Sequence, residues 1–593
     1  MEKSKITKSL AVFASVLLII IIGVASFAYF GTFNVNLNNN VAVNINSSSP
    51  GDATFTSNAT QLNLQVPAAN MSYTVANNTV AAKEDTAFLD VTLTGSQNLL
   101  TTCTYDIVYE YGAGSNVYGQ GTTTKTSGAT KEITLEVNGM NGNNHFAIER
   151  NFDHASIQSY YDSTNKYYKL VEGATIKSLG STQSVRWKIT GRYYNLDVSQ
   201  AQLGGKNFTG KIYAISKGCS SEDGTTVKKG YETILANNGG AASMTTLTST
   251  DFATATTASD KGMYKAQDDL GTSYYFRGAV DNNWVKYGKY TKDTYITADS
   301  NDNTSLVESC DGLELCAKLA SKGDDMYWRI MRVNGDNSIR MIYTGTYAPD
   351  NNTKVTMTNS DSVFSKTSIG YSAFNQNRDS AEYVGYMYTI GEQHGTSKSS
   401  DIKTYLEDWY ANYTNLNATG TKITDQIYCN DRTTSTTEVA YTLTAYTTLT
   451  SWTSTGTQYY YGGYGRIVKD NNPILTCAVD SDRFTVNKIN GKGNSALTYP
   501  IGLITIDEVE MAGKNWSERS NQSYYLHTGD WYWTGSPSEF SDGHFAVEFG
   551  VSGVGSLDFT DVDIIGGVRG VVSLSSDAKL LGSGTYNDVY IVS

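Results

Sequence analysis

The chain contains five histidines, the residue type most often used for acid-base chemistry and metal binding. They are His145, His154, His394, His527 and His544. None belongs to an HExxH or H-x-H pair, and the sequence has no GxSxG elbow, P-loop or paired-histidine zinc motif. His527 and His544 flank the block WYWTGSP and could face one pocket, but two histidines at that separation are more often incidental polar residues. We therefore predict no enzymatic activity, no catalytic residue and no cofactor.

Six cysteines could form disulfides or hold a metal. The chain has no CxxC pair, and no histidine lies near a cysteine, so structural disulfides are the favoured interpretation. Many connectivities are possible for six cysteines, and proximity alone suggests one of them. That set is Cys310 with Cys316, Cys429 with Cys477, and Cys103 with Cys219.

Oxygen-bearing side chains occur at loop spacing at Asp299, Asn301 and Asn303. The glycine and the final glutamate of an EF-hand loop are missing, so a solvated linker is the favoured interpretation and no metal site is predicted.

Two aromatic pairs could form sugar-binding platforms. Trp409 and Tyr410 have the helical spacing that is typical of core packing. Trp531 and Trp533 share one face of a predicted strand, and burial of that face is favoured over exposure.

An apolar segment, LAVFASVLLIIIIGVASFAYF, occupies residues 10–30 without a charge. As a helix it would be roughly 30 Å long, enough to cross a membrane. Lys3, Lys5 and Lys8 precede it and no further basic residue occurs before Lys83, which predicts an extracellular location for everything after residue 30. The segment is either a retained transmembrane anchor, which its length favours, or a signal peptide cleaved after Ala28. No LPxTG-type sorting signal precedes the terminal NDVYIVS.

The amino-acid composition excludes some classes of protein and favours others. The 593 residues carry 45 basic and 58 acidic side chains, for a net charge of −13, so nucleic acid is not an expected partner. The 43 tyrosines, with abundant Thr, Asn, Ser and Gly, favour strands joined by polar turns. A chain of this length is expected to form two or three domains of mainly β structure.

Short alternating runs predict strands between about residues 60 and 218. They are LNLQV, AFLDVTLTG, CTYDIVYEY, KEITLEVNG, SVRWKITG and KIYAI. In the second run, Phe88, Val91 and Leu93 are interspersed with polar residues, as a half-buried strand requires. Regularly spaced strands without helices predict a β-sandwich domain over residues 61–227, after an Asn- and Ser-rich spacer or first edge strand at residues 31–60.

A further run of strands is predicted from residue 228. It comprises TILANNGG, DKGMYKAQDDLGTSYYFRGAVDNNWVKYG and DMYWRIMRVNGDNSIRMIYTG. In the last block, strands at 328–333 and 338–343 flank Asn334-Gly335, a dipeptide that tolerates positive φ and favours a tight hairpin.

Two short amphipathic helices are predicted next. In SSDIKTYLEDWYANY, Ile402, Leu406 and Trp409 fall at i, i+4 and i+7, with Ser399 or Ser400 as the N-cap. In LITIDEVEMAG, the capping box and the stop residue are Thr505, Glu508 and Gly513.

The N-terminal block resembles TasA/camelysin-type biofilm fibre proteins of Gram-positive bacteria. The resemblance covers roughly residues 1–215 and lies in the Lys-led apolar run ending in GVASFAYF and in the strand-rich region that follows. It implies a part in assembly on the cell surface.

The C-terminal part resembles C-type-lectin-like domains that close secreted surface proteins of Gram-positive gut bacteria. The matching blocks span about 230–593 and are YYFRGAVDNNWV, YWRIMRVNGDNSIRMIY, AEYVGYMY, IKTYLEDWY, YCNDR, YPIGLITIDEVEMAG, YYLHTGDWYWTGSPSEF and GGVRGVVSL. The resemblance implies an α+β domain over residues 228–593 with a loop-built binding surface. In place of the usual Pro after GVR this chain has Gly570.

The resemblance also implies limits. The Glu-Pro-Asn or Gln-Pro-Asp motif and the Trp-Asn-Asp motif of calcium-dependent sugar binding do not occur, so that activity is not expected. Formylglycine-generating enzymes share the fold and use cysteines late in the chain, whereas the last cysteine here is Cys477.

Some proteins of this fold carry a C-terminal region diversified by a retroelement, and residues 540–566 are compatible with such a region. The predicted ligand-binding residues are Phe540, Asp542, His544, Glu548, Asp558, Phe559, Asp561, Asp563, Ile564 and Ile565. Apolar groups ringed by carboxylates are typical of protein-binding surfaces. The alternative, an ordinary core strand with polar turns, stays open.

The favoured hypothesis is therefore an exported, cell-surface ligand-binding protein or adhesin. Its partner would be a protein or glycan on a cell or phage surface, and the apolar segment would contact the membrane. The alternative is a fibre or surface-layer subunit that assembles through the β-sandwich domain.

Overall fold

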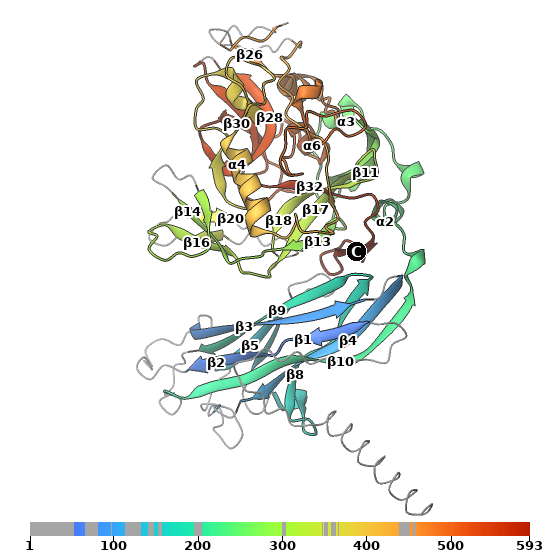
Figure 1. Cartoon of the computed structure of the whole chain (residues 1–593), viewed down its shortest axis with the longest axis vertical. Helices are drawn as coiled ribbons and strands as arrows, with labels where there is room; N and C mark the ends of the chain where they lie inside the picture. Colours follow the sequence, from blue (N-terminus) through green and yellow to red (C-terminus); the bar gives the residue numbers. More distant parts are fainter. Residues whose placement is uncertain are drawn as a thin grey trace, which may run out of the picture. The chain divides into compact units, whose positions relative to one another are not determined.

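The computed structural model describes a mainly β protein (Figure 1). It describes residues 53–65, 81–95, 98–112, 115, 132–139, 147–151, 157–194, 204–298, 304–346, 348, 354–356, 363–365, 367–437, 451–454, 458–541 and 543–593. These residues belong to one compact unit, Asn44–Ser593. The apolar segment at 10–30 and the oxygen-rich loop at 299–303 lie outside the described residues. Among the helices that are described, none is long and apolar enough to span a membrane.

Two five-stranded sheets form the first part of the described chain, in the orders β1-β3-β9-β5-β6 and β2-β10-β4-β8-β7. The strands are β1 Thr54–Ser57, β2 Thr60–Gln65, β3 Ala81–Thr94, β4 Leu99–Tyr111, β5 Ile133–Gly139, β6 Ala147–Asn151, β7 Tyr161–Asp162, β8 Tyr167–Leu179, β9 Thr182–Tyr194 and β10 Asn207–Asp223. Each strand predicted between residues 60 and 218 is present. Buried side chains of both sheets share one hydrophobic cluster, as the alternating pattern requires.

A nine-stranded sheet begins the remaining part. Its main path is β24-β32-β18-β17-β13-β34-β33, and β12 pairs with both β11 and β17. The strands are β11 Lys261–Asp268, β12 Gly271–Gly278, β13 Trp284–Lys289, β17 Asp325–Val333, β18 Ile339–Gly345, β24 Ile423–Thr424, β32 Val571–Leu574, β33 Leu580–Leu581 and β34 Tyr590–Val592. β17 and β18 are antiparallel neighbours, so the predicted hairpin is confirmed. The positive φ of its turn, 68°, falls at Asn337 rather than at Asn334-Gly335.

A six-stranded sheet carries the candidate site. Its path is β21-β31-β28-β29-β30, and β26 also pairs with β28. The strands are β21 Tyr371–Ala373, β26 Tyr459–Tyr460, β28 Tyr532–Phe540, β29 Ala546–Val551, β30 Leu557–Asp561 and β31 Ile565–Gly567. The remaining strands form small sheets: β14 Thr294–Ala298, β15 Thr304–Val307 and β16 Cys316–Ala320; β19 Lys354–Thr356 with β20 Val363–Ser365; β22 Met387–Tyr388 with β23 Lys398–Ser399; and β25 Tyr428–Cys429 with β27 Arg483–Phe484.

Helices are few and short. They are α2 Gly230–Asn237, α3 Ser249–Phe252, α4 Asp401–Asp408, α5 Gly462–Tyr464 and α6 Ile506–Met511, with π-helical turns η6 Trp409–Tyr413 and η7 Gly465–Asp470. The 3-10 turns are η1 Ile157–Tyr160, η3 Gly224–Thr226, η4 Ala241–Ser243, η5 Ala381–Val384 and η8 Asp480–Asp482. Both predicted helices are confirmed. α6 has the capping box of Thr505 and Glu508, and Gly513 follows it with a φ of 129°.

The strand predicted at TILANNGG is wrong, because this segment forms the helix α2. A carboxylate oxygen of Glu232 accepts the N–H of Lys229 at 3.0 Å, which caps the first turn. Asn238 and two glycines of positive φ end the helix. The segment is short and has a single large buried side chain, Ile234, so its hydrophobic pattern carries no clear period.

The aromatic residues of α4 and η6 form part of the core. Trp409 packs against the hairpin side chains Trp328 and Tyr343, with ring centroids 6.3 and 5.3 Å away. Trp409 and Tyr410 are both buried, which confirms core packing rather than a sugar platform.

Ser400 caps α4. Its hydroxyl accepts the N–H of Lys403 at 3.2 Å and donates to the carbonyl of Tyr386 at 2.8 Å. We expect Ser400→Ala to lower the free energy of unfolding by about 1–2 kcal/mol, because a cap and a buried hydrogen bond are lost together. Ser399→Ala, at an exposed neighbour, is expected to change it by less than about 0.5 kcal/mol. Urea unfolding of both variants checks this, and equal losses would contradict the assignment of the cap.

Three disulfides have the predicted connectivity. Cys103–Cys219 joins paired positions of β4 and β10, and the others are Cys310–Cys316 and Cys429–Cys477. Disulfides form and persist in oxidising compartments, which indicates an oxidising environment for the described part of the chain.

Candidate ligand-binding face

The predicted ligand-binding residues that the structure describes lie on and around β28, β29 and β30. Figure 1 labels β28 and β30. β29 and β30 form an antiparallel hairpin in which Val551 pairs with Leu557 and Val547 with Asp561. β28 and β29 are buried along their whole length, so the hairpin rests on a fixed central strand. Among the strands that the structure describes, β30 is the last on its side of the sheet.

Two glycines let a tryptophan lie flat on this sheet. A Cβ on either Gly550 or Gly566 would overlap the ring of Trp531. The Trp531 ring also meets Trp533 edge-on, with centroids 4.4 Å apart. Trp533 is fully buried, as predicted, whereas Trp531 is half-buried.

The predicted residues fall into three groups in the structure. Phe540 and Glu548 are buried, at 1% and 0% exposure, so neither contributes to a surface. Asp542 lies outside the described residues. The exposed or half-buried members are His544, Asp558, Phe559, Asp561, Asp563, Ile564 and Ile565.

Burial of Phe540 and Glu548 has a physical reason. Both faces of β28 and β29 are covered, so neither strand has a solvent-facing set of alternate positions. Neither carboxylate oxygen of Glu548 has a hydrogen-bond donor. Burial raises the pKa of Glu548 well above its ordinary value, and the nearby positive charge of Arg432 only partly opposes the rise.

An arginine that the sequence did not single out organises the carboxylates. The guanidinium of Arg378 lies 2.6 Å from Asp561 and 3.3 Å from Asp563, and its carbon is 4.0 Å from the centre of the Phe545 ring. Burial raises the pKa of Asp561, the charge of Arg378 opposes the rise, and the charge of Asp563 adds to it. Arg378 is 183 residues before Asp561 in the chain, so no local motif could reveal the contact.

Apolar groups lie beside these charges. The rings of Phe559 and Trp516 are stacked, with centroids 5.7 Å apart and planes within 7° of parallel. Ile564 is 47% exposed, and Ile565 is half-buried. Pairing holds the underlying backbone in place, because Gly566 pairs with Ser372 and Ile565 with Ala373 of β21.

The two histidines near this region are separately engaged. His527 Nε2 lies 3.1 Å from the carbonyl oxygen of Gly553, and the ring of His544 lies against Phe540. His544 lies in the turn before β29, whereas His527 contacts the turn after it, so the two histidines lie at opposite ends of that strand.

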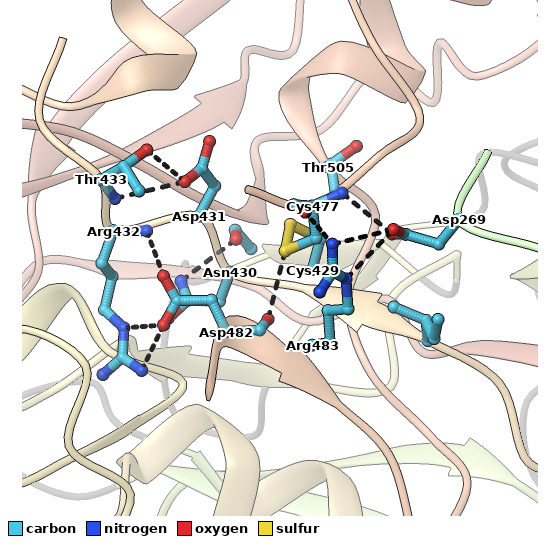
Figure 2. The surroundings of a disulfide bond; sticks show 12 residues. Asp269, Cys429, Asn430, Asp431, Arg432, Thr433, Cys477, Asp482, Arg483 and Thr505 are labelled. Atoms are coloured by element: carbon cyan, nitrogen blue, oxygen red, sulfur yellow. Dashed lines mark hydrogen bonds and ion pairs between the residues drawn. A yellow bond between two sulfur atoms is a disulfide. The ribbon is translucent and has the colours of Figure 1, made fainter. Parts of the chain in front are cut away.

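A buried polar network around the Cys429–Cys477 disulfide (Figure 2) also contacts β28. The Asn430 amide donates to the carbonyls of Gly535 in β28 and of Val384, at 3.2 Å each. Figure 2 shows Arg432 and Asp482 facing one another next to the Cys429–Cys477 disulfide. The Arg432 Nε and Nη2 atoms lie 2.9 and 2.6 Å from one Asp482 oxygen.

The same network anchors a loop. Arg432 Nη1 donates to the carbonyls of Met387 and Gly395, at 2.8 and 2.9 Å. The second oxygen of Asp482 accepts the Arg432 main-chain N–H at 2.8 Å and lies 2.9 Å from Nδ1 of His394. The disulfide and this ion pair therefore hold the chain under β28 in one arrangement.

A small polar cavity lies near the Cys429–Cys477 disulfide, but the charged side chains that line it are already paired with one another. It is a cavity of about 30 Å³ lined by residues that include Arg332, Arg340, Arg466, Asp507 and Glu508. Ion pairs of 2.7–3.0 Å join Glu508 to Arg332 and Arg340, and Arg466 to Asp507. This space suits about two water molecules rather than a substrate.

Within the described part of the chain, no group of three or more His, Cys, Asp or Glu side chains is placed to hold a metal ion. Comparison with protein-family models gives no match for this chain, and no curated protein is similar to it.

Proposed function

We propose that this protein is an exported surface protein that acts by binding a ligand rather than by catalysis. In this proposal the two five-stranded sheets form a β-sandwich, and residues 228–593 form a C-type-lectin-like domain. The segment at 10–30 exports the chain or tethers it to the membrane.

The single observation that carries the proposal is the surface made by β30 and the turn that follows it, hereafter the β30 face, which comprises Asp558, Phe559, Asp561, Asp563 and Ile564. Ile565 begins β31 and pairs with β21, so it is not part of this face. Ile564 is among the few large apolar side chains that are strongly exposed in the described structure. Apolar atoms ringed by charges are the composition of protein-binding sites, where a few central residues supply most of the affinity. The fixed strands beneath the face limit the entropy lost on binding.

The test is a charge introduced at Ile564. The full chain in detergent is applied to immobilised glycans and to immobilised surface proteins of bacterial and host cells. We expect at least one ligand to bind and Ile564→Asp to weaken that binding by about tenfold or more, because a carboxylate would have to be desolvated at the contact.

Leu313→Asp is the matched control, since Leu313 is 38% exposed in the loop closed by Cys310 and Cys316. It should bind like the unaltered chain, and both variants should unfold at the same urea concentration. Equal binding by both variants would exclude the β30 face as the binding site.

A further inference from the structure

The open side of β30 provides a second kind of binding element, the polypeptide backbone itself. No described strand pairs with β30 on the side away from β29. Strand edges of this kind accept an added strand from another chain, because their N–H and C=O groups lack sheet partners.

The hydrogen-bond phase of the hairpin shows which groups face outward. Ser552 N–H donates to the carbonyl of Ser556, and Val562 N–H donates to that of Ala546. Hydrogen-bonded and non-hydrogen-bonded pairs alternate along an antiparallel ladder. The backbone groups of Leu557, Phe559 and Asp561 therefore point away from β29, since each occupies a non-hydrogen-bonded pair.

One contact independently supports the conclusion that the backbone groups of Phe559 point away from β29. The N–H of Phe559 donates to the carboxylate of Asp558, at 2.9 Å. A side chain of the strand itself thus occupies the place that an incoming carbonyl would take. The Asp561 carbonyl likewise accepts the N–H of Ile564 in the following turn, at 3.1 Å.

The charges beside the edge select the partner. Three carboxylates, Asp558, Asp561 and Asp563, outnumber the guanidinium of Arg378 that pairs with two of them, so these four groups are together net negative. A second copy of the chain would bring like charges together, whereas a basic segment would be attracted. Apolar side chains mark both ends of the strand, since Val554 is 49% and Ile564 is 47% exposed.

We propose that the β30 face binds an extended, basic segment of a partner protein, which adds to the sheet as a strand beside β30. This inference rests on the proposed function and names the chemistry of its ligand. Asp558 and Asp561 are three positions apart in the strand, so their side chains lie on opposite faces of the sheet. Basic side chains of the segment would lie against the carboxylate on either face, and apolar ones would contact Val554 and Ile564. A five-residue strand spans about 17 Å, so a segment of about seven residues covers it.

The probe is the peptide acetyl-KVKVKVK-amide, added to the full chain in detergent. Its companion, acetyl-KPKPKPK-amide, has the same charge but cannot form a regular strand ladder. We expect the first peptide to bind at least about tenfold more tightly than the second and to slow amide hydrogen exchange in the segment that contains β30. Asp558→Lys should weaken its binding by about tenfold or more, and Asp311→Lys, at an exposed site in the loop closed by Cys310 and Cys316, should not.

Equal binding of the two peptides, or no binding of the first, would overturn the proposal. So would unchanged exchange in the β30 segment when the first peptide is bound. A surface ligand that is lost with Ile564→Asp but leaves β30 exchange unchanged would overturn strand addition and leave the proposed function standing. A surface ligand that is insensitive to Ile564→Asp would overturn the proposed function instead.

Discussion

Replacing Asp482 by Ala is expected to lower the free energy of unfolding of the C-terminal part by about 3–5 kcal/mol, because it leaves a buried guanidinium without its counter-ion. Asp482 is fully buried and accepts hydrogen bonds from Nε, Nη2 and the main-chain N–H of Arg432. Arg432 is itself buried, so water cannot replace the lost carboxylate.

Urea unfolding followed by tryptophan fluorescence measures this effect, since seven of the eight tryptophans follow residue 228. The double variant Asp482→Ala, Arg432→Met is the control. It removes the uncompensated charge and should recover part of the loss, but not all of it, because Arg432 also donates to the carbonyls of Met387 and Gly395. A loss of less than about 1 kcal/mol in the single variant would contradict a buried, supporting ion pair.

Replacing Glu510 by Gln is expected to stabilise the protein at neutral and alkaline pH. Neither carboxylate oxygen of Glu510 has a hydrogen-bond donor. The nearby amide of Asn515 donates instead to the Phe252 carbonyl and to the side-chain oxygen of Asn471. Burial raises the pKa of Glu510 from 4.5 to about 9, and the charge of Asp507 adds to the rise.

The direction of the pH dependence follows from the pKa of Glu510 in the unfolded chain and in the folded chain. The unfolded chain releases this proton near its ordinary pKa of 4.5, whereas the folded chain keeps it up to about 9. The contribution of Glu510 to stability is therefore fully present below pH 4.5 and is lost as pH rises to about 9. At pH 7 the loss in the free energy of unfolding, relative to acidic pH, is up to about 3 kcal/mol. Glu510→Gln should recover this loss, and urea unfolding measures it.

Glu508→Gln is the matched control on the same helix, with the opposite sign. Burial raises the pKa of Glu508, but the charges of Arg340 and Arg332 outweigh it and hold that pKa below its ordinary value. Its removal should therefore destabilise the protein at pH 7, with an effect that fades under acidic conditions. A Glu510→Gln variant whose stability changes with pH as the unaltered protein does would contradict the buried neutral carboxyl.

Local chemistry predicted the elements that depend on neighbours in the chain. Asn334-Gly335 identified the β17–β18 turn, and Thr505 with Glu508 identified the start of α6. Each of these signals is complete within a few residues, so it needs no knowledge of the tertiary structure.

The site was predicted less completely, because its geometry depends on distant contacts. Phe540 and Glu548 were expected at the surface, yet β28 and β29 are covered on both faces and show no alternation of burial. Arg378 belongs to a loop that is far in the sequence from Asp561 and Asp563, which it contacts, so no residue spacing within 540–566 could identify it. The short helix α2 was missed for a different reason. Its cap joins Lys229 and Glu232 and is local, but lysine is not a preferred N-cap residue and the hydrophobic pattern of the segment is weak.

The central claim is that the β30 face is displayed on a fixed scaffold and can change without loss of the fold. The most direct measurement randomises Asp558, Asp563 and Ile564 together in the full chain and records protease resistance and ligand binding for each variant. We predict that most variants stay as resistant as the unaltered chain while their binding is lost or redirected. In contrast, replacing Gly550 or Gly566 by Val should abolish resistance, since each would overlap the Trp531 ring. If resistance instead falls across the randomised set as it does for the glycine variants, these residues are part of the core and the account is contradicted.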